Sequence, residues 1–482
     1  MPRPFCTTGV DQGGSLLSKM KIILYVIDSL RADHLPCYGY KRSTAPYIQS
    51  LVHDSVIFEK AYCQSTWTRA SAASILTGTY PSVHGVITME DFMPFDIRTL
   101  PELLKEHGYQ TIGISAMGNV SSTFGFNKGF DHFVDLYKDE ELLQKRGRTS
   151  EYKFFKRYEK EHTIVDPLAE DITQKAIPFI EKYYDQKMFI FLWSIDVHNP
   201  FFPPIKKFSN YPYEGPIDGS NKSIRKAKRP KEIQRLIDLY DDEIYYNDQC
   251  IGEFINYLKK KGIYDESLII LTSDHGESFY EHGLKGHGQI PYEEQIHIPL
   301  IIKFPRSENR GHREGTIVQL IDLYPTIAKL AGVNNIPAYV CGTDLRKVIR
   351  TKERMERYAF VETRLKRSRA LWRAVRTERW KYIVQSPPEW SRRFLFSNPF
   401  GALTFLKDFM KGKRQWLFNL EIDPEEKVNV IGKELKVADA LQKIMQKWQD
   451  EILKLREEIG CRTAGEIDDQ TAQHLRNLGY ID

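Results

Sequence analysis

Short, almost uninterrupted apolar segments recur along this chain, and they constrain its fold more than any other feature. Their β-branched and aromatic content predicts strands that are buried on both faces, as in a parallel sheet covered by helices. Predicted helices lie between them, for example at residues 167–185 and 230–262. This alternation predicts an α/β protein with a large, mostly parallel sheet sandwiched by helices. The predicted strands cover residues 21–27, 110–116, 187–195, 267–273 and 298–304.

The character of the sequence changes near residue 350. Beyond it come short predicted strands and then a long charged helix at residues 433–460, which together predict a small α+β subdomain. We therefore predict a main domain over residues 20–350 and a C-terminal subdomain over residues 351–482. Residues 1–19 are polar and aperiodic, and we interpret them as a disordered tail or as the product of a start codon assigned too early.

Composition excludes several classes of protein. The 69 basic and 64 acidic residues leave a net charge of only +5, so electrostatics give no reason to expect a nucleic-acid partner. No run approaches the roughly 18 to 20 apolar residues of a membrane span, and the first twenty residues lack the apolar run of a secretion signal. The expected location is therefore the cytoplasm. Six scattered cysteines without CxxC spacing fit reduced thiols better than disulfides or a thiolate zinc site.

Three of the predicted strands are followed by side chains suited to metal binding or acid–base chemistry. Asp28 directly follows the first strand, and His198 lies just beyond the third. Asp274 and His275 follow the fourth. Because ligands bind at the carboxyl ends of strands in open α/β sheets, we expect these residues to lie together. Two carboxylates and an imidazole predict a site for one divalent cation, namely calcium, manganese or zinc. Each aspartate alone can instead cap a turn or a helix.

Residues 65–78, STWTRASAASILTG, predict a short helix that follows a group of hydroxyl side chains. The alanine-rich run has high helix propensity and Gly78 is a natural C-cap, so Thr68 is expected at the N-cap. An anion placed there meets free backbone N–H groups and the positive end of the helix dipole. A hydroxyl that also binds a metal loses its proton more easily and becomes a nucleophile. Thr68 is therefore the candidate nucleophile, and the alternative is that it only caps the helix.

Several longer motifs occur together in this chain. They resemble motifs of the sulfatase family of the alkaline phosphatase superfamily, and the resemblance extends from Lys21 over nearly the whole sequence. It implies an alkaline phosphatase-like fold and a sulfatase-like catalytic main domain. The motifs are YVIDSLRADHLPCYGY (25–40), STAPYIQSLVHDSVIFEKAY (43–62), TSDHGESFYEHG (272–283), LIDLYPTIAKLAGV (320–333), WKYIV (380–384) and WLFNLEIDPEEKVNV (416–430).

The resemblance also implies roles for individual residues around the reacting group. It implies a metal site formed by Asp28, Asp274 and His275. The family's nucleophile begins the helix that ends in LTG, which implies that Thr68 is both the nucleophile and a further metal ligand.

Other positions are implied to contact the substrate. His198, in the segment HNP, matches the histidine that protonates the leaving group. The segment KGHGQIPYEE implies that His287 contacts the substrate anion, with Lys285 as a second candidate. Arg69 and Asn119 are also predicted to bind the substrate.

The chain departs from the pattern of the sulfatases proper at three places, one of which is the region of Gly118 and Asn119, where the family usually has a lysine and a histidine. Those enzymes carry Cys or Ser, any residue, Pro, Ser and Arg, and they convert the first residue to formylglycine, which Thr68 cannot form. Cys63 lies five residues too early to replace it. Ser29 stands where the family has a second aspartate. A threonine in this context resembles instead the phosphonate monoester hydrolases and the phosphoethanolamine or phosphoglycerol transferases, which form a phosphothreonine intermediate.

Taken together, these features predict a metal-dependent hydrolase that cleaves sulfate- or phosphate-type esters through a covalent intermediate on Thr68. The substrate is expected to be an anionic ester carried on a glycan or a lipid. One alternative is a transferase that moves a phospho group onto a glycan or a lipid. Another is a catalytically inactive protein of this fold that only binds an anion.

One further segment, residues 392–414, combines an apolar helical face with flanking basic residues. Such a helix can lie on an anionic membrane surface, which predicts a weak peripheral membrane contact. The alternative is that its phenylalanines pack into the core, as in most amphipathic helices of globular proteins.

Overall fold

The computed structural model describes most of the chain, and the statements below concern that part. Residues 1–18 and nearly all of the segment 392–414 lie outside it, so the predicted tail and the predicted membrane contact stay predictions. None of the described helices has both the length and the apolar character needed to cross a bilayer. The described residues are 19–146, 167–210, 212–213, 215–351, 356–366, 370–386, 414–460 and 465–480.

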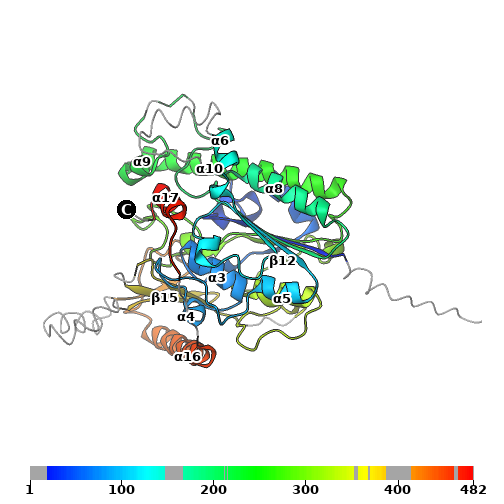
Figure 1. The fold of residues 1–482 in the computed structure, drawn as a ribbon. Helices are drawn as coiled ribbons and strands as arrows, with labels where there is room; N and C mark the ends of the chain where they lie inside the picture. The colour runs from blue at the N-terminus through cyan, green and yellow to red at the C-terminus, as the bar shows by residue number, and fades with distance from the viewer. Residues whose placement is uncertain are drawn as a thin grey trace, which may run out of the picture.

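A large mixed sheet forms the centre of the molecule (Figure 1). Its middle strand, β1, is buried at every residue and pairs in parallel with β6 on one side and β7 on the other. Most pairings are parallel, which confirms the predicted fold class, whereas β11 runs antiparallel to both of its neighbours. In order across the sheet, the strands are β12 (Arg313–Glu314), β2 (Val56–Phe58), β11 (Leu300–Lys303), β7 (Leu268–Thr272), β1 (Lys21–Ile27), β6 (Met188–Ser194), β4 (Gln110–Ser115) and β5 (His132–Asp135).

The strand predicted at residues 298–304 is divided in the structure. Pro299 separates β10 (His297–Ile298), which belongs to a small side sheet, from β11 in the main sheet. Proline has no N–H to donate to a strand ladder, so a break at this residue is expected. The side sheet also holds β3 (Ala61–Tyr62) and β13 (Val318–Gln319), and a separate hairpin pairs β8 (Ser278–Phe279) with β9 (Lys285–Gly286).

Helices cover both faces of the main sheet (Figure 1). One layer contains α8 and α10, which pack on each other, and α8 also packs on β6 and β4. The opposite layer contains α3, α5 and α12. This arrangement explains why the strands are apolar on both faces. The helices of the main sheet are α2 (Pro46–Leu51), α3 (Thr68–Thr77), α4 (Pro81–His84), α5 (Leu100–Glu106), α6 (Glu140–Arg146), α8 (Ala169–Lys182), α9 (Asn221–Lys226), α10 (Pro230–Lys260), α11 (Glu293–Ile296), α12 (Leu323–Leu330) and α13 (Leu345–Arg350).

A second, antiparallel sheet follows in the chain. Its strands pair in sequence order, and helix α16 (Leu435–Ile459) packs on it and on α4. A last helix, α17 (Asp469–Asn477), lies far from α16, on the opposite side of this sheet (Figure 1). The predicted division of the chain at residue 350 stays a prediction. The strands of the sheet are β14 (Ala359–Thr363), β15 (Leu371–Arg376), β16 (Trp380–Ser386) and β17 (Gln415–Asn419).

A buried lysine closes the amino-terminal end of β7. The side chain of Lys303 is completely buried, and its Nζ donates to the carbonyl oxygens of Tyr264, Asp265 and Ser267, at 2.5, 2.7 and 3.1 Å. These carbonyls belong to the turn that leads into β7, and those of Tyr264 and Asp265 also accept from the backbone N–H groups of Ser267 and Arg306. Burial lowers the pKa of this lysine to about 8. The ammonium group has therefore exchanged its hydrating water for three carbonyl acceptors.

We expect Lys303→Met to lower the free energy of unfolding by roughly 2 to 4 kcal/mol, because it removes the buried donor that these three carbonyls share. Thermal unfolding followed by calorimetry measures the change. Lys329→Met is the matched control, since Lys329 makes one exposed contact with the carbonyl of Asn334 at 3.3 Å. Equal denaturation midpoints for the two variants would contradict this account.

Candidate active site

The predicted metal ligands lie together at the carboxyl ends of β1 and β7. Ligand atoms of Asp28, Asp274 and His275 all lie within 4.8 Å of one another, and all three side chains are buried. His275 Nε2 is 3.2 Å from Asp274 Oδ2 and 3.9 Å from Asp28 Oδ1. They meet because β1 and β7 are adjacent and parallel, so both strands deliver their next residue to the same edge.

The donor set fits a divalent cation. Asp274 Oδ2 is buried and has no hydrogen-bond partner in the described part of the chain, which leaves one carboxylate oxygen aimed into the cluster. Burial, and then the charge of Asp274, raise the pKa of Asp28 to about 8. Burial also raises the pKa of Asp274 to about 7. Two buried carboxylates can both stay ionised when a cation offsets their repulsion and their lost hydration.

Ser29 supports this cluster from the position where the family has a second aspartate. Its backbone N–H donates to Asp274 Oδ1 at 3.0 Å, and its hydroxyl donates to Asp28 Oδ1, also at 3.0 Å. The φ angle of Ser29 is 62°, in the left-handed region that strains a residue with a side chain. Tyr240 holds this conformation, since its hydroxyl donates to the Ser29 carbonyl at 2.7 Å. Ser29 therefore fixes both carboxylates without adding a third charge.

Thr68 begins the helix that faces the metal cluster. The prediction of Thr68 as N-cap is wrong by one position, because Trp67 has the extended backbone of the N-cap and Thr68 is the first residue of α3. No side chain caps this helix, so the Thr68 hydroxyl is not used as a cap. Its Oγ1 lies 3.2 Å from His275 Nε2. Gly78, with φ 67°, ends the helix as predicted.

Two further histidines approach the same point. His198, which follows β6, and His287, in the loop after β9, have ring centroids 4.8 Å apart. His287 Nδ1 is 3.1 Å from Glu277 Oε2, and its ring centroid is 4.4 Å from that of His275. Burial, and then the neighbouring His275, lower the pKa of His287 well below its usual range. Both histidines therefore lie at the site where the sequence predicts them, although their roles stay predictions.

The other predicted substrate-binding residues lie in different surroundings. The Arg69 guanidinium is buried against the ring of Phe124, 3.3 Å from its centroid, and donates to the Asn119 side chain at 2.7 Å. It also donates to two backbone carbonyls. Burial lowers the pKa of Arg69 to about 9. Lys285 donates to the Arg225 carbonyl at 2.5 Å. Substrate binding by Arg69, Asn119 and Lys285 stays a prediction.

Sequence reasoning missed two residues that contact this site. Glu277 pairs with His287, and its Oε1 is buried and has no hydrogen-bond partner among the described residues. Its position two residues after His275 was a local signal that could have indicated it. Tyr480 is the second: its hydroxyl lies 2.9 Å from Thr68 Oγ1. No local signal indicates Tyr480, because the two residues are 412 positions apart.

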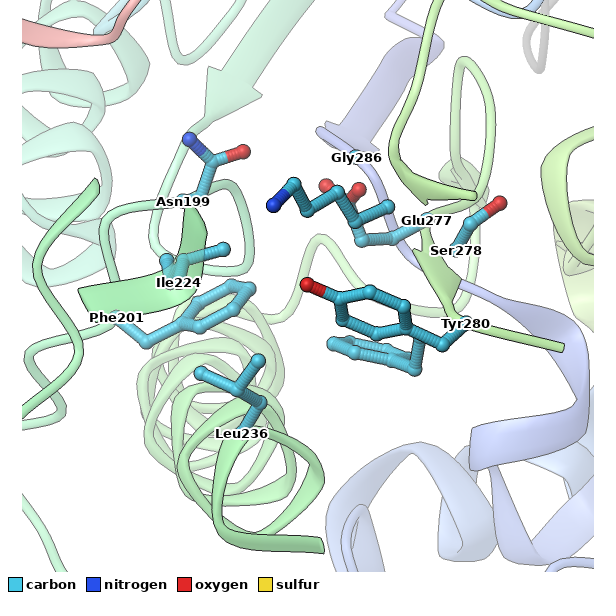
Figure 2. Close-up of a pocket in the computed structure, with 10 residues that line it drawn as sticks. Asn199, Phe201, Ile224, Leu236, Glu277, Ser278, Tyr280 and Gly286 are labelled. Carbon is cyan, nitrogen blue, oxygen red and sulfur yellow. The ribbon is translucent and has the colours of Figure 1, made fainter. Parts of the chain in front are cut away.

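A small pocket adjoins the histidines (Figure 2). Asn199, the neighbour of His198, and Phe201 line one side, and Tyr280 lines the other. Glu277 and Leu236 also contribute to its wall, so that the pocket combines polar groups near the histidines with apolar ones farther away.

Comparison with known families identifies two matching regions. Residues 21–333 match the sulfatase family model. Residues 281–391 match the model described as N-sulphoglucosamine sulphohydrolase, C-terminal. The first match contains Asp28, Thr68 and Asp274, and it covers more than half of the chain.

Individual relatives agree with these matches. An N-acetylglucosamine-6-O-sulfatase of Bacteroides thetaiotaomicron is 24% identical, with 86% of this chain and 82% of the relative covered. A phosphonate monoester hydrolase of Silicibacter pomeroyi has a TM-score of 0.68 at 20% identity, with 93% of this chain and all of that chain covered. A protein solved with its substrate D-glucosamine-2-N,6-O-disulfate has a TM-score of 0.67 at 20% identity, with 91% and 98% covered. The solved structures show the fold.

We expect Asp274→Asn to weaken the binding of a divalent cation by about tenfold or more, because a neutral amide is a poorer ligand than a carboxylate. Calorimetric titration and elemental analysis measure affinity and stoichiometry. Asp248→Asn is the matched control. Asp248 is a buried carboxylate that accepts hydrogen bonds from the backbone N–H groups of Tyr47 and Ile48 and from the side-chain amide of Gln249. Unchanged affinity in Asp274→Asn would remove this residue from the metal site.

Proposed function

This chain belongs to the sulfatase family of ester hydrolases, and we propose that it cleaves a sulfate- or phosphate-type ester through a covalent intermediate on Thr68. One observation carries the proposal: the Thr68 hydroxyl lies at the start of α3, 3.2 Å from the Nε2 of His275, which forms the buried cluster with Asp28 and Asp274. A hydroxyl in this position is next to a cation site and next to the free N–H groups of a helix.

The metal site assists this hydroxyl through Asp28, Asp274 and His275. A divalent cation bound there lowers the pKa of a hydroxyl that it touches and offsets negative charge on the transferred group. Thr68 has given its proton to solvent before the reaction and attacks the central atom of the ester as an alkoxide, which leaves again unprotonated when water cleaves the intermediate. The N–H groups in the first turn of α3 face the oxygens of the transferred group and stabilise their charge.

His198 supplies the proton that the leaving oxygen needs. It follows β6 at the same edge of the sheet as the metal cluster, and it adjoins the pocket next to Asn199. In our proposal a protonated His198 donates from Nε2 to the departing oxygen, which becomes a neutral alcohol. Water then attacks the intermediate on Thr68, and the neutral His198 accepts the water's proton. In a hydrolase, water accepts the transferred group, so no second alcohol is needed.

His287 orients the anion in this proposal. Its Nδ1 faces Glu277, so that its Nε2 faces the Tyr480 hydroxyl at 3.0 Å, which also lies 2.9 Å from Thr68 Oγ1. The Glu277 carboxylate fixes the orientation of the ring, as carboxylates do for many catalytic histidines. His287 then contacts a non-bridging oxygen of the transferred group.

A sulfated or phosphorylated sugar is the substrate class that we propose. Asn199, Lys285 and Phe201 all line the pocket beyond His198. Amide and ammonium groups donate to sugar hydroxyls, and an aromatic ring packs on the apolar face of a sugar. The solved relative with a disulfated glucosamine substrate supports this class. A lipid-linked ester and a cytoplasmic location stay predictions.

A phosphonate or phosphate ester is the second candidate substrate. Thr68 favours it, because threonine cannot be converted to formylglycine, and the likeness to a phosphonate monoester hydrolase agrees with it. No observation favours transfer to a second alcohol over transfer to water. The inactive-protein alternative does not explain why two acidic metal ligands, a nucleophile and two histidines converge on one point.

We expect Thr68→Ala to reduce kcat for nitrophenyl esters roughly a thousandfold or more, because no other side chain replaces the nucleophile. Peptide mass analysis of the wild type after a substrate quench should find an adduct of about 80 Da on the peptide with Thr68. High-resolution mass then separates phosphate from sulfate. Thr77→Ala, at the other end of α3, is the matched control and should keep its activity. Activity of Thr68→Ala within tenfold of the wild type would exclude the covalent route.

We expect His198→Ala to slow alkyl esters by about 10² to 10⁴ and to slow nitrophenyl esters far less, because a nitrophenolate leaves without a proton. A series of esters with leaving groups of graded pKa measures the difference. His312→Ala is the control, since His312 is exposed and pairs with Glu314. An equal loss along the whole series would show that His198 binds substrate or metal instead.

A further inference from the structure

The segment 465–480 returns from the C-terminal sheet to the active site. It contains α17, which lies beside α9 rather than beside α16 (Figure 1). The segment ends the described part of the chain at Tyr480, whose side chain is only 7% exposed. Holding a chain segment in one conformation costs about 1 to 2 kcal/mol per residue in backbone entropy, so an ordered return of this length needs specific contacts.

Such contacts fix α17 at both of its ends. Near its start, Asp468 accepts from Lys138 at 2.8 Å, and the Thr471 hydroxyl lies 2.8 Å from the Tyr137 hydroxyl. The Tyr137 and His474 rings stack at 4.4 Å. Near its end, the Asn477 carbonyl accepts from the Asn221 side chain at 2.9 Å, and two buried leucines, Leu475 and Leu478, join the main core. The helix is therefore held against the main domain before Tyr480 is reached.

The Tyr480 hydroxyl lies at the meeting point of the proposed catalytic groups. Its oxygen is 2.9 Å from Thr68 Oγ1, 3.1 Å from His198 Nε2 and 3.0 Å from His287 Nε2. Its ring stacks on His198, with centroids 5.4 Å apart and an interplanar angle of 25°. A phenol packed here for its apolar ring alone would not direct its one polar atom toward three polar side chains.

We propose that Tyr480 is a further catalytic residue, and that its hydroxyl donates a hydrogen bond to a non-bridging oxygen of the group transferred to Thr68. The inference rests on the proposed function, since it takes Thr68 as the nucleophile. Any group bonded to Thr68 Oγ1 adjoins an oxygen 2.9 Å away. The C-terminal region therefore supplies part of the active site of the main domain.

The valence of the phenol determines how the hydrogen bonds must rearrange. A tyrosine hydroxyl has one proton to donate and two lone pairs that accept, so its three contacts with Thr68, His198 and His287 use its full capacity. When substrate binds, Thr68 turns to the central atom and His198 to the leaving oxygen. The Tyr480 proton is then free for the non-bridging oxygen. This donor adds no charge beside the metal site, unlike lysine or arginine.

The test compares Tyr480→Phe with Tyr264→Phe. The first removes only the hydroxyl and keeps the ring that stacks on His198. The second removes a buried hydroxyl of similar type, bonded to Asp54 at 2.9 Å, before the amino-terminal end of β7 and hence far from the site. Both variants of the full chain are loaded with the same divalent metal and compared with the wild type for denaturation midpoint, kcat/KM and affinity for inorganic sulfate.

We expect Tyr480→Phe to lower kcat/KM about 10- to 100-fold and to weaken the binding of inorganic sulfate about tenfold, as for the loss of one donor to an anion. Tyr264→Phe should change neither by more than about twofold while lowering the denaturation midpoint. Sulfate binding is measured by calorimetry and needs no turnover. It therefore tests Tyr480 even if Thr68→Ala shows that Thr68 is not the nucleophile.

Three results would overturn the inference. Tyr480→Phe with wild-type kcat/KM and wild-type sulfate affinity would make the hydroxyl structural. A rise in either quantity would make Tyr480 an obstruction that the substrate has to displace. A metal-loaded wild type that binds no sulfate at millimolar concentration would show that no anion site exists beside Tyr480.

Discussion

The burial of two carboxylates at the centre of the main sheet is the constraint on which the rest of this structure depends. Asp28 and Asp274 lie in an interior where their charges repel each other, and among the described residues only His275 lies within ion-pair distance of them. A bare pair of this kind would take up a proton near neutral pH, as the raised pKa of each shows. A divalent cation bound there would remove that penalty. In the proposed function, Ser29 orients both carboxylates, and the uncapped start of α3 and the converging histidines surround the anion beside the cation.

The sequence predicted five of the eight strands of the main sheet and most of the candidate site residues, because these depend on local patterns, whereas the short strands β2, β5 and β12 were missed. A strand covered on both faces must be apolar throughout, which is why residues 21–27 match β1 residue for residue. Polar residues directly after such strands can only lie at the edge of the sheet, so the position of Asp274 followed from the pattern alone. The direction of β11 could not be predicted, since a short apolar run carries no information about the direction in which its neighbour runs.

Contacts between distant parts of the chain account for what was missed. Tyr480 reaches Thr68 because residues of the main domain, among them Tyr137 and Asn221, hold α17 in place. No local sequence pattern indicates that these side chains contact α17. The N-cap position was missed for a related reason. Threonine is a common cap, yet the backbone at Trp67 is already extended, and so the Thr68 hydroxyl stays available for chemistry.

Helix α3, which begins at Thr68, is connected to the C-terminal sheet as well as to Tyr480. Helix α3 packs on α4, and in α4 the backbone N–H and hydroxyl of Ser82 both donate to the buried carboxylate of Glu362 on β14, at 3.0 and 2.8 Å. Glu362 also pairs with Arg373 on β15, at 2.7 Å. The position of Thr68 therefore depends on the C-terminal sheet on one side, through buried polar contacts that are costly to leave unpaired, and the hydroxyl of Tyr480 reaches it from the other. A site built in this way depends on both parts of the chain, because the main sheet positions Asp28, Asp274, His275 and His198, whereas the C-terminal region braces α3 through α4 and supplies Tyr480.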